Sequence, residues 1–162
     1  MTAVAGQELD WLRSRLSGRV KALYLDRLSP DVISVITAQQ PRKQSPMSLL
    51  IAFPMSGAFC EVPDDATAFG GSRAPGIAIT VAAVASEPGL LAADRDWARH
   101  FWQDLLPHAP GPGSYVNFMT DYEADRVRAS YGPARYQRLA QVKAAYDPSN
   151  VFHRNPNINP AG

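Results

Sequence analysis

The chain contains little cysteine, no long apolar run and almost no net charge. Cys60 is the single cysteine among 162 residues, which excludes an internal disulfide and a cysteine metal cluster. The longest apolar run, 77–85, contains Thr80 and is far below the roughly 20 residues that a membrane-spanning helix needs. Charged residues interrupt the amino-terminal segment, so no signal peptide is expected. Together these absences predict a cytoplasmic protein with no membrane partner.

The charge balance gives no reason to expect nucleic acid as a partner. The 16 lysines and arginines nearly equal the 15 acidic residues, for a net charge of +1. The one basic run, Arg13, Arg15, Arg19 and Lys21, is interpreted as a solvated helix face and the turn after it. An apolar fraction of 46% is typical of a globular protein, and the length suits a single domain over 1–162.

Several kinds of site lack their usual residue patterns. The histidines, His100, His108 and His153, have no metal-ligand spacing, and no cysteine or carboxylate completes a set, so no metal site is predicted. The serines lack the context of a nucleophile elbow. The chain also has no glycine-rich dinucleotide-binding pattern. The sequence therefore gives no support to hydrolase chemistry.

The spacing of apolar residues predicts helices in four places. Leucines form one helical stripe over 9–16. Ser29 and Pro30 are the residue types of a helix N-cap and first position, although β-branched residues follow them. A long helix is predicted over 91–106, and a last helix ends at Asp147. The side chains expected to be buried on the long helix are Trp97, Phe101, Trp102 and Leu105, and those that share one face of the last helix are Tyr136, Leu139, Val142 and Tyr146.

Alternating apolar residues predict strands over 48–53, 58–62, 77–85 and 114–119. The short connection between the first two favours an antiparallel hairpin, because a parallel crossover needs about a dozen residues. Strands followed by helices predict an α+β domain with a mostly antiparallel sheet and helices packed on one face. The asparagines and prolines over 155–162 predict an extended carboxyl-terminal tail.

Tyr115 and Asn117 are the residues of the predicted strands that most suggest chemistry. They stand two positions apart, so on a strand both side chains leave the same face. A phenol beside a carboxamide suits a redox site, where a proton must leave the atom that gives up a hydride. A tyrosine on an alternating strand can equally serve packing, and spacing alone leaves both interpretations open.

The carboxyl-terminal part carries a series of motifs. Tyr115-Val116-Asn117 is followed by a helical segment ending in Lys143-Ala144-Ala145-Tyr146-Asp147-Pro148, and then by Asn155-Pro156-Asn157-Ile158. This series, over 114–160, resembles the C-terminal signature of the berberine bridge enzyme-like FAD-linked oxidoreductases. The resemblance implies that the chain is the substrate domain that closes over a flavin in that family.

The resemblance also implies roles for three residues. Tyr115 corresponds to the tyrosine that acts as proton acceptor, or orients the substrate, above the flavin. Asn117 corresponds to an asparagine on the cofactor side of the site, and Asn155 to a tail asparagine that reaches back to the flavin. A free phenol titrates near 10, so a general-base tyrosine needs a cation or the field of the flavin beside it. Arg73, in the loop that matches the family, is the nearest candidate cation.

The FAD-binding half of such an enzyme has no counterpart in these 162 residues. We therefore expect weak or no FAD binding by this chain alone, because a dinucleotide needs backbone donors at a glycine-rich turn. One hypothesis is the substrate-binding part of an FAD-linked oxidase or dehydrogenase, which uses a separate FAD-binding polypeptide and acts on a small hydroxyl-bearing or carbohydrate-like substrate. The alternative is a non-catalytic relic or repurposed fragment that serves as a dimerisation or partner-binding module.

Both hypotheses predict association with another chain. Without an FAD-binding half, the tail residues Val151, Phe152 and Ile158 would lack their covering. Contiguous exposed apolar residues favour association, and a symmetric dimer is the commonest result. We therefore expect a homo-oligomer, or a heteromer with an FAD-binding polypeptide.

Overall fold

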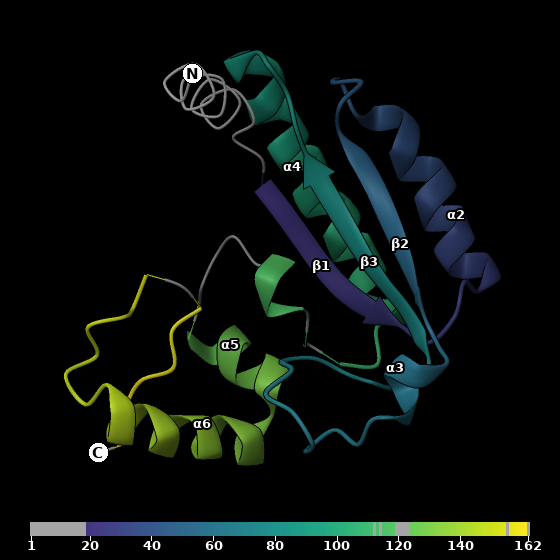
Figure 1. Cartoon of the computed structure of the whole chain (residues 1–162). Coiled ribbons are helices and arrows are strands. Elements are labelled where there is room, and N and C mark those ends of the chain that lie inside the picture. Colours follow the sequence, from purple (N-terminus) through teal and green to yellow (C-terminus); the bar gives the residue numbers. More distant parts are fainter. Residues whose placement is uncertain (1–18, 112, 114, 119–123, 155, 162) are drawn as a thin grey trace, which may run out of the picture.

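The structure is a computed structural model that describes residues 19–111, 113, 115–118, 124–154 and 156–161. The helix predicted over 9–16 lies outside the described residues, as does Asn155. The described residues form a sheet layer with helices on one side and a separate group of helices near one end of the sheet (Figure 1).

The sheet has three antiparallel strands in the order β1-β3-β2. They are β1 (Arg19–Leu25), β2 (Leu49–Met55) and the central β3 (Gly76–Ala83). Leu23 of β1 lies opposite Ile79 of β3, and Ala52 of β2 lies opposite the same residue. The predicted α+β class and antiparallel sheet are confirmed, and so are the strands predicted over 48–53 and 77–85.

Strand β1 corrects the interpretation of the basic run. Arg19 and Lys21 belong to this strand, not to a helix face and the turn after it. Lys21 lies over the Trp102 ring, 5.4 Å from its centroid, and the Trp102 indole donates a 3.1 Å hydrogen bond to the Ala22 carbonyl. Alternating basic and apolar residues suit an edge strand, where a lysine stem can cover an aromatic ring while its charge stays near solvent.

The helices α2 (Pro30–Gln39) and α4 (Pro88–Leu105) pack together on one face of the sheet. Ser29 caps α2 as predicted, because its hydroxyl accepts a 3.3 Å hydrogen bond from the Val32 N–H. The Trp97 indole of α4 donates a 2.8 Å hydrogen bond to the Gln39 carbonyl, so the end of α2 is tied to α4. Short 3₁₀ turns follow the two helices, over Gln40–Arg42 and Leu106–His108.

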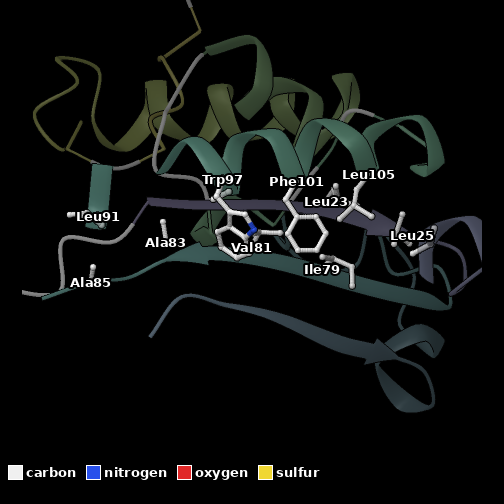
Figure 2. Close-up of a cluster of buried hydrophobic side chains, with 12 residues drawn as sticks. Leu23, Leu25, Ile79, Val81, Ala83, Ala85, Leu91, Trp97, Phe101 and Leu105 are labelled. Carbon is white, nitrogen blue, oxygen red and sulfur yellow. The ribbon is translucent and has the colours of Figure 1, made fainter. Parts of the chain in front are cut away.

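The main core lies between α4 and the sheet. Figure 2 shows Trp97 and Phe101 of α4 beside Ile79 and Val81 of β3. Burial of these side chains is the main favourable term for the fold, at about 25 cal/mol per Å² of apolar surface. The predicted burial of the long helix is confirmed for Trp97, Phe101 and Leu105, whereas Trp102 is only partly buried at the edge of this core.

A buried carboxylate fixes the segment that leads into β2. Asp94 of α4 accepts hydrogen bonds from the Ser48 hydroxyl at 2.5 Å, the Gln44 N–H at 2.7 Å and the Ser45 N–H at 2.9 Å. Burial by itself would raise the pKa of Asp94, but these hydrogen bonds outweigh it and hold the pKa below its usual range. Asp94 therefore stays ionised although it is buried, because both of its carboxylate oxygens accept hydrogen bonds.

The strand and hairpin predicted at 58–62 are wrong. Residues Ala58–Glu61 form a single helical turn, α3, and β2 pairs with β3 instead. Gly57 adopts a φ of 60°, and its carbonyl accepts a 2.8 Å hydrogen bond from the Cys60 N–H. An alternation of a few residues fits one helical turn as well as a strand, and the left-handed glycine decides for the turn.

The strand predicted over 114–119 is also wrong where the structure describes it. Residues Val116–Phe118 form a 3₁₀ turn, η3, that contacts β1. Two helices follow, α5 (Ala124–Tyr131) and α6 (Pro133–Tyr146). Gly132, at a φ of 75°, makes the sharp corner between them.

A second, smaller core joins α5, α6 and η3. It contains Val116, Val127 and Tyr136, with Tyr131 and Ile158 packed against it. The predicted face of the last helix is thus buried at Tyr136, but Val142 is 47% exposed and Tyr146 is 88% exposed. Of the tail residues expected to be uncovered, Val151 and Phe152 are exposed, while Ile158 has a covering in this core.

Candidate functional site

Tyr115 and Asn117 lie together, although not through the geometry that the sequence predicted. Tyr115 precedes the 3₁₀ turn, and Asn117 is its middle residue. The Asn117 side-chain amide donates a 2.7 Å hydrogen bond to the Tyr115 hydroxyl oxygen. The expected pair of a phenol and a carboxamide is therefore present, and a tight turn brings the two groups into contact instead of a strand.

An aromatic layer supports the Tyr115 ring. The Phe69 ring stacks on Tyr115, with centroids 5.5 Å apart and an interplanar angle of 25°. Phe69 in turn meets Phe59 edge-on, with centroids 5.4 Å apart. Such pairs contribute about 0.5–1.5 kcal/mol beyond their buried area. The ring that carries the candidate proton acceptor is thus set against a second ring from a distant loop.

Arg73, the candidate cation, lies behind this layer. Its guanidinium is 4.9 Å from the centroids of both Phe59 and Phe69. It also donates hydrogen bonds to the Phe59 carbonyl at 3.1 Å and to the Thr67 hydroxyl at 2.9 Å. The structure therefore places Arg73 against the ring that stacks on Tyr115, where it supports the aromatic layer.

Arg135 ties the same loop to the carboxyl-terminal helices. From the first turn of α6 it donates hydrogen bonds to the Phe69 carbonyl at 2.9 Å, the Asp64 carbonyl at 3.1 Å and the Gly71 carbonyl at 3.2 Å. Its Nε donates a further 2.8 Å bond to the Tyr131 carbonyl at the end of α5. One planar guanidinium thereby joins the loop to the corner between the helices.

Two further tyrosines pack against the glycines of this loop. A Cβ on Gly71 would lie 2.3 Å from the Tyr24 hydroxyl, and a Cβ on Gly70 would lie 2.7 Å from the Tyr131 ring. Burial raises the pKa of Tyr24 to about 12, Tyr115 adds to the rise, and Arg135 opposes it. Burial also raises the pKa of Tyr131. Both phenols therefore stay protonated at neutral pH.

A hollow of about 300 Å³ adjoins the loop and the corner between α5 and α6. This volume is at the small end of the range for ligand pockets. The described residues that line it include Tyr24, Ser72, Ser130 and Arg135, and the remainder are Asp64, Gly71, Pro110, Gly111, Gly113, Ala129 and Gly132. The hollow thus has polar groups on its walls and belongs to the same part of the molecule as Tyr115.

Hydrogen bonds around Lys143 and Asp147 hold the start of the tail. The Lys143 ammonium contacts the Asp147 carboxylate at 2.5 Å and donates to the Phe152 carbonyl at 2.7 Å. Asp147 accepts from the Val151 N–H at 2.8 Å and the Phe152 N–H at 3.1 Å. The hydrogen bond from Lys143 is the largest cause that lowers the pKa of Asp147. This arrangement explains the spacing of the lysine and aspartate in the motif.

Sequence reasoning missed the residues that assemble the site. Tyr24 had no assigned place because β1 was not predicted, and the sequence predicted no role for Phe69 or Arg135. An arginine in the first turn of a helix is a weak signal for Arg135, since a cation is unfavourable at that end of the helix dipole unless it has acceptors. Contacts between residues 66 positions apart have no other signal in one sequence.

The described residues fit one end of a flavin better than the other. The paired phenol and amide of Tyr115 and Asn117 are suited to the polar edge of a flavin ring. A pyrophosphate needs open backbone donors at glycines, but the space beside Gly70 and Gly71 is filled by Tyr131 and Tyr24.

Among the described residues, no group of three or more histidine, cysteine or acidic side chains is placed to hold a metal ion. The helices within the described ranges include none that is long and apolar enough to cross a membrane.

Comparison with known proteins finds one family model that matches the carboxyl-terminal segment and two curated relatives. The family described as "Berberine and berberine like" matches residues 114–159. The FAD-linked oxidoreductase iacH of Pestalotiopsis fici is 31% identical over 96 residues, which is 56% of this chain and 19% of that protein. (R)-6-hydroxynicotine oxidase of Paenarthrobacter nicotinovorans is 45% identical over 47 residues, which is 29% of this chain and 10% of that protein.

The fold is shared with solved structures. The crystal structure of a glycopeptide hexose oxidase in complex with teicoplanin matches 90% of this chain and 32% of its own, with a TM-score of 0.76 and 24% identity. The chain therefore spans about a third of that structure and a fifth or less of the two curated relatives. Residues 114–159 match the berberine and berberine-like family model, and the resemblance of this chain to the berberine bridge enzyme-like FAD-linked oxidoreductases is confirmed.

Proposed function

We propose that this chain is the substrate-binding part of an FAD-linked oxidoreductase that works with a separate FAD-binding polypeptide. Its substrate is a small hydroxyl-bearing or carbohydrate-like molecule, and Tyr115 is the proton acceptor. The observation that carries the proposal is the contact between the Asn117 amide and the Tyr115 hydroxyl, inside the segment that matches the family.

The bound flavin would supply the hydride acceptor. The residues of this chain then have to accept a proton and to hold the acceptor in place. Before the reaction the phenol must lose its own proton to solvent. The Asn117 amide donates to the Tyr115 oxygen, and this hydrogen bond is retained and strengthened in the phenolate. A phenolate so held can take the proton from a substrate hydroxyl as the hydride leaves the adjacent carbon.

Roles on the cofactor side are assigned by the same proposal. Asn117 and the tail residue Asn155 contact the flavin, while the pyrophosphate is bound by the partner polypeptide. The lysine–aspartate pair at 143 and 147 supports the tail assignment, because it anchors the residues that lead to Asn155. The chain alone is expected to bind FAD weakly or not at all.

Exposed apolar side chains favour an association in either version of the proposal. Tyr146 is 88% exposed, Phe152 is 75% exposed and Val151 is 65% exposed, and all three lie where α6 passes into the tail. In the split enzyme this surface meets the FAD-binding polypeptide. The second candidate function, a non-catalytic module that dimerises or binds another partner, would use the same surface for a copy of the chain.

The test is reconstitution. The chain is co-expressed with an FAD-binding polypeptide of the family, and flavin reduction and oxygen uptake are followed with a panel of sugars and small alcohols. Tyr115→Phe should lower turnover by about 10²–10⁴-fold while flavin binding changes little, because a proton acceptor is lost and the ring is kept.

Ser34→Ala is the control, because it removes an exposed hydroxyl of α2 that donates only to the Pro30 carbonyl of its own helix in the described structure. Turnover that is equally insensitive to both substitutions would return Tyr115 to a packing role. An assembled pair that binds flavin yet oxidises nothing, together with a stable homodimer of this chain, would favour the non-catalytic module.

A further inference from the structure

The support of the Tyr115 ring comes from Phe69, in a loop 46 residues earlier in the chain. Phe69 stacks on Tyr115, and its neighbour Phe59 belongs to the helical turn α3. A side chain that fixes a general base does so by limiting the orientations that the base can adopt. Because Tyr115 lies outside regular structure, its ring orientation depends on such contacts.

The position of Phe69 is itself fixed from two sides. Arg73 holds it from within the loop, with its guanidinium 4.9 Å from the Phe69 ring centroid and hydrogen bonds to Phe59 and Thr67. Arg135 holds it from α6 through a 2.9 Å hydrogen bond to the Phe69 carbonyl. Gly70, the next residue, has no room for a Cβ because the Tyr131 ring lies 2.7 Å from that position. The loop can therefore place Phe69 in only a narrow range of positions.

We propose that Phe69 is a positioning residue for Tyr115, and that Arg73 and Arg135 act through it. The stack orients the Tyr115 ring, and the Asn117 amide then fixes the phenol oxygen at one corner of the site. The inference rests on the proposed function for the reaction itself, but the positioning of the ring exists in the isolated chain. Errors of about 1 Å in the placement of a reacting group can cost roughly 10²-fold in rate.

Two substitutions of Phe69, one aliphatic and one aromatic, distinguish a positioning role of this residue from a packing role. Phe69→Leu keeps an apolar side chain and conserves most of the volume, so a packing role tolerates it. It removes the stacked ring, so a positioning role does not. Phe69→Tyr keeps the ring and should behave like the natural residue in both measurements below.

The first measurement uses the isolated chain with tyrosines labelled for NMR. A ring stacked at 5.5 Å shifts the ring protons of Tyr115 by its ring current. Phe69→Leu should move the Tyr115 signals toward their random-coil positions, and Phe69→Tyr should leave them in place. Met47→Leu, at a side chain that is 42% exposed ahead of β2, is the control and should move nothing. Unchanged Tyr115 signals in Phe69→Leu would overturn the proposal.

The second measurement uses the assembled enzyme. Phe69→Leu should lower kcat by about ten- to a hundred-fold, and Phe69→Tyr should restore it to within about two-fold of the natural chain. A normal kcat in Phe69→Leu, with displaced Tyr115 signals, would also overturn the positioning role. If the assembled natural chain turns nothing over, the proposed function fails, while the NMR experiment still decides whether Phe69 orients Tyr115.

Discussion

The sheet layer and the carboxyl-terminal helices are held together by different forces. Between α4 and the sheet, a cluster of twelve buried apolar residues includes several side chains with no exposed surface. Among the residues that the structure describes, the buried members of the carboxyl-terminal core are Val116, Val127 and Tyr136. There the structure relies on charged side chains that bind backbone carbonyls and amides, at Arg135, Lys143 and Asp147.

The comparison indicates that one kind of interaction stabilises the fold and another positions the loop and the tail. Apolar burial is non-directional and gives the sheet layer its stability, whereas hydrogen bonds from arginine and lysine have fixed geometry and set the positions of loops and tail. The candidate site lies where these two regions meet, with Tyr24 from β1, Phe69 from the loop and Tyr115 beside η3. Substitutions that separate stability from positioning test this division.

The largest effect is expected in the main core. Phe101→Ala removes a ring with 0% exposure and should lower the free energy of unfolding by about 3–5 kcal/mol, because lost burial adds to the cost of the cavity. Urea denaturation followed by circular dichroism measures it. Phe152→Ala, at a ring that is 75% exposed, should change the same quantity by less than about 0.5 kcal/mol. Similar losses in both would contradict the placement of the core.

A smaller effect is expected at the buried carboxylate of α4. Asp94→Asn should cost roughly 2–3 kcal/mol at neutral pH, because the amide cannot accept from all three donors. Since the folded pKa is lowered, the stability from Asp94 is fully present above the unfolded pKa of about 3.9 and is lost as pH falls through the folded value. The difference in unfolding free energy between the natural protein and Asp94→Asn should therefore shrink as the pH falls. Urea denaturation at several pH values from about 2 to about 7 measures this difference, and a difference that does not change with pH would contradict the assignment.

The clamp between the two regions should affect local order more than global stability. Arg135→Ala removes four hydrogen bonds to the carbonyls of Asp64, Phe69, Gly71 and Tyr131. We expect the free energy of unfolding to fall by about 1–3 kcal/mol. We also expect faster hydrogen exchange in the loop that contains Phe69. Arg138→Ala, one turn later and exposed, is the matched control. Equal exchange in both variants would show that Arg135 does not order the loop.

The smallest effect concerns the tail. Lys143→Met keeps the apolar stem of the side chain but removes the ammonium that joins Asp147 to the Phe152 carbonyl. The amides of Val151 and Phe152 should exchange faster with solvent, while the unfolding transition moves little. Gln141→Met, at an exposed position of the same helix, controls for the added thioether. Unaltered exchange at the two amides would mean that Asp147 holds them without help from Lys143.

Much of the sheet layer was predictable because its signals are local and repeated. The stripe from Trp97 to Leu105 repeats over several helical turns, and Ser29 with Pro30 marks a helix start by residue type alone. The errors fall where the signal is short. Residues 58–62 and 115–118 offer too few positions to distinguish a strand from a turn. Strand β1 was not predicted because its basic residues interrupt the apolar pattern.

The sequence singled out Tyr115 and Asn117, whose functional roles stay predictions, but it did not predict how the candidate site is assembled. Tyr115 and Asn117 were identified through the motif, and the structure brings them into contact for a different geometric reason. Asn155 stays a prediction, since it lies outside the described residues. The parts played by Phe69, Arg73 and Arg135 depend on pairings between distant segments, which a single sequence does not encode in any local pattern.

The sequence by itself determined the class of fold, the position of the long helix and the motif that marks the family, because periodicity, capping residues and motif spacing act within a few residues of one another. Only the tertiary structure decided which strand pairs with which, that a turn and not a strand presents Tyr115, and that an arginine of α6 holds the loop beneath it. These features are settled by packing and by the need of buried polar groups for partners, and both are properties of the assembled chain.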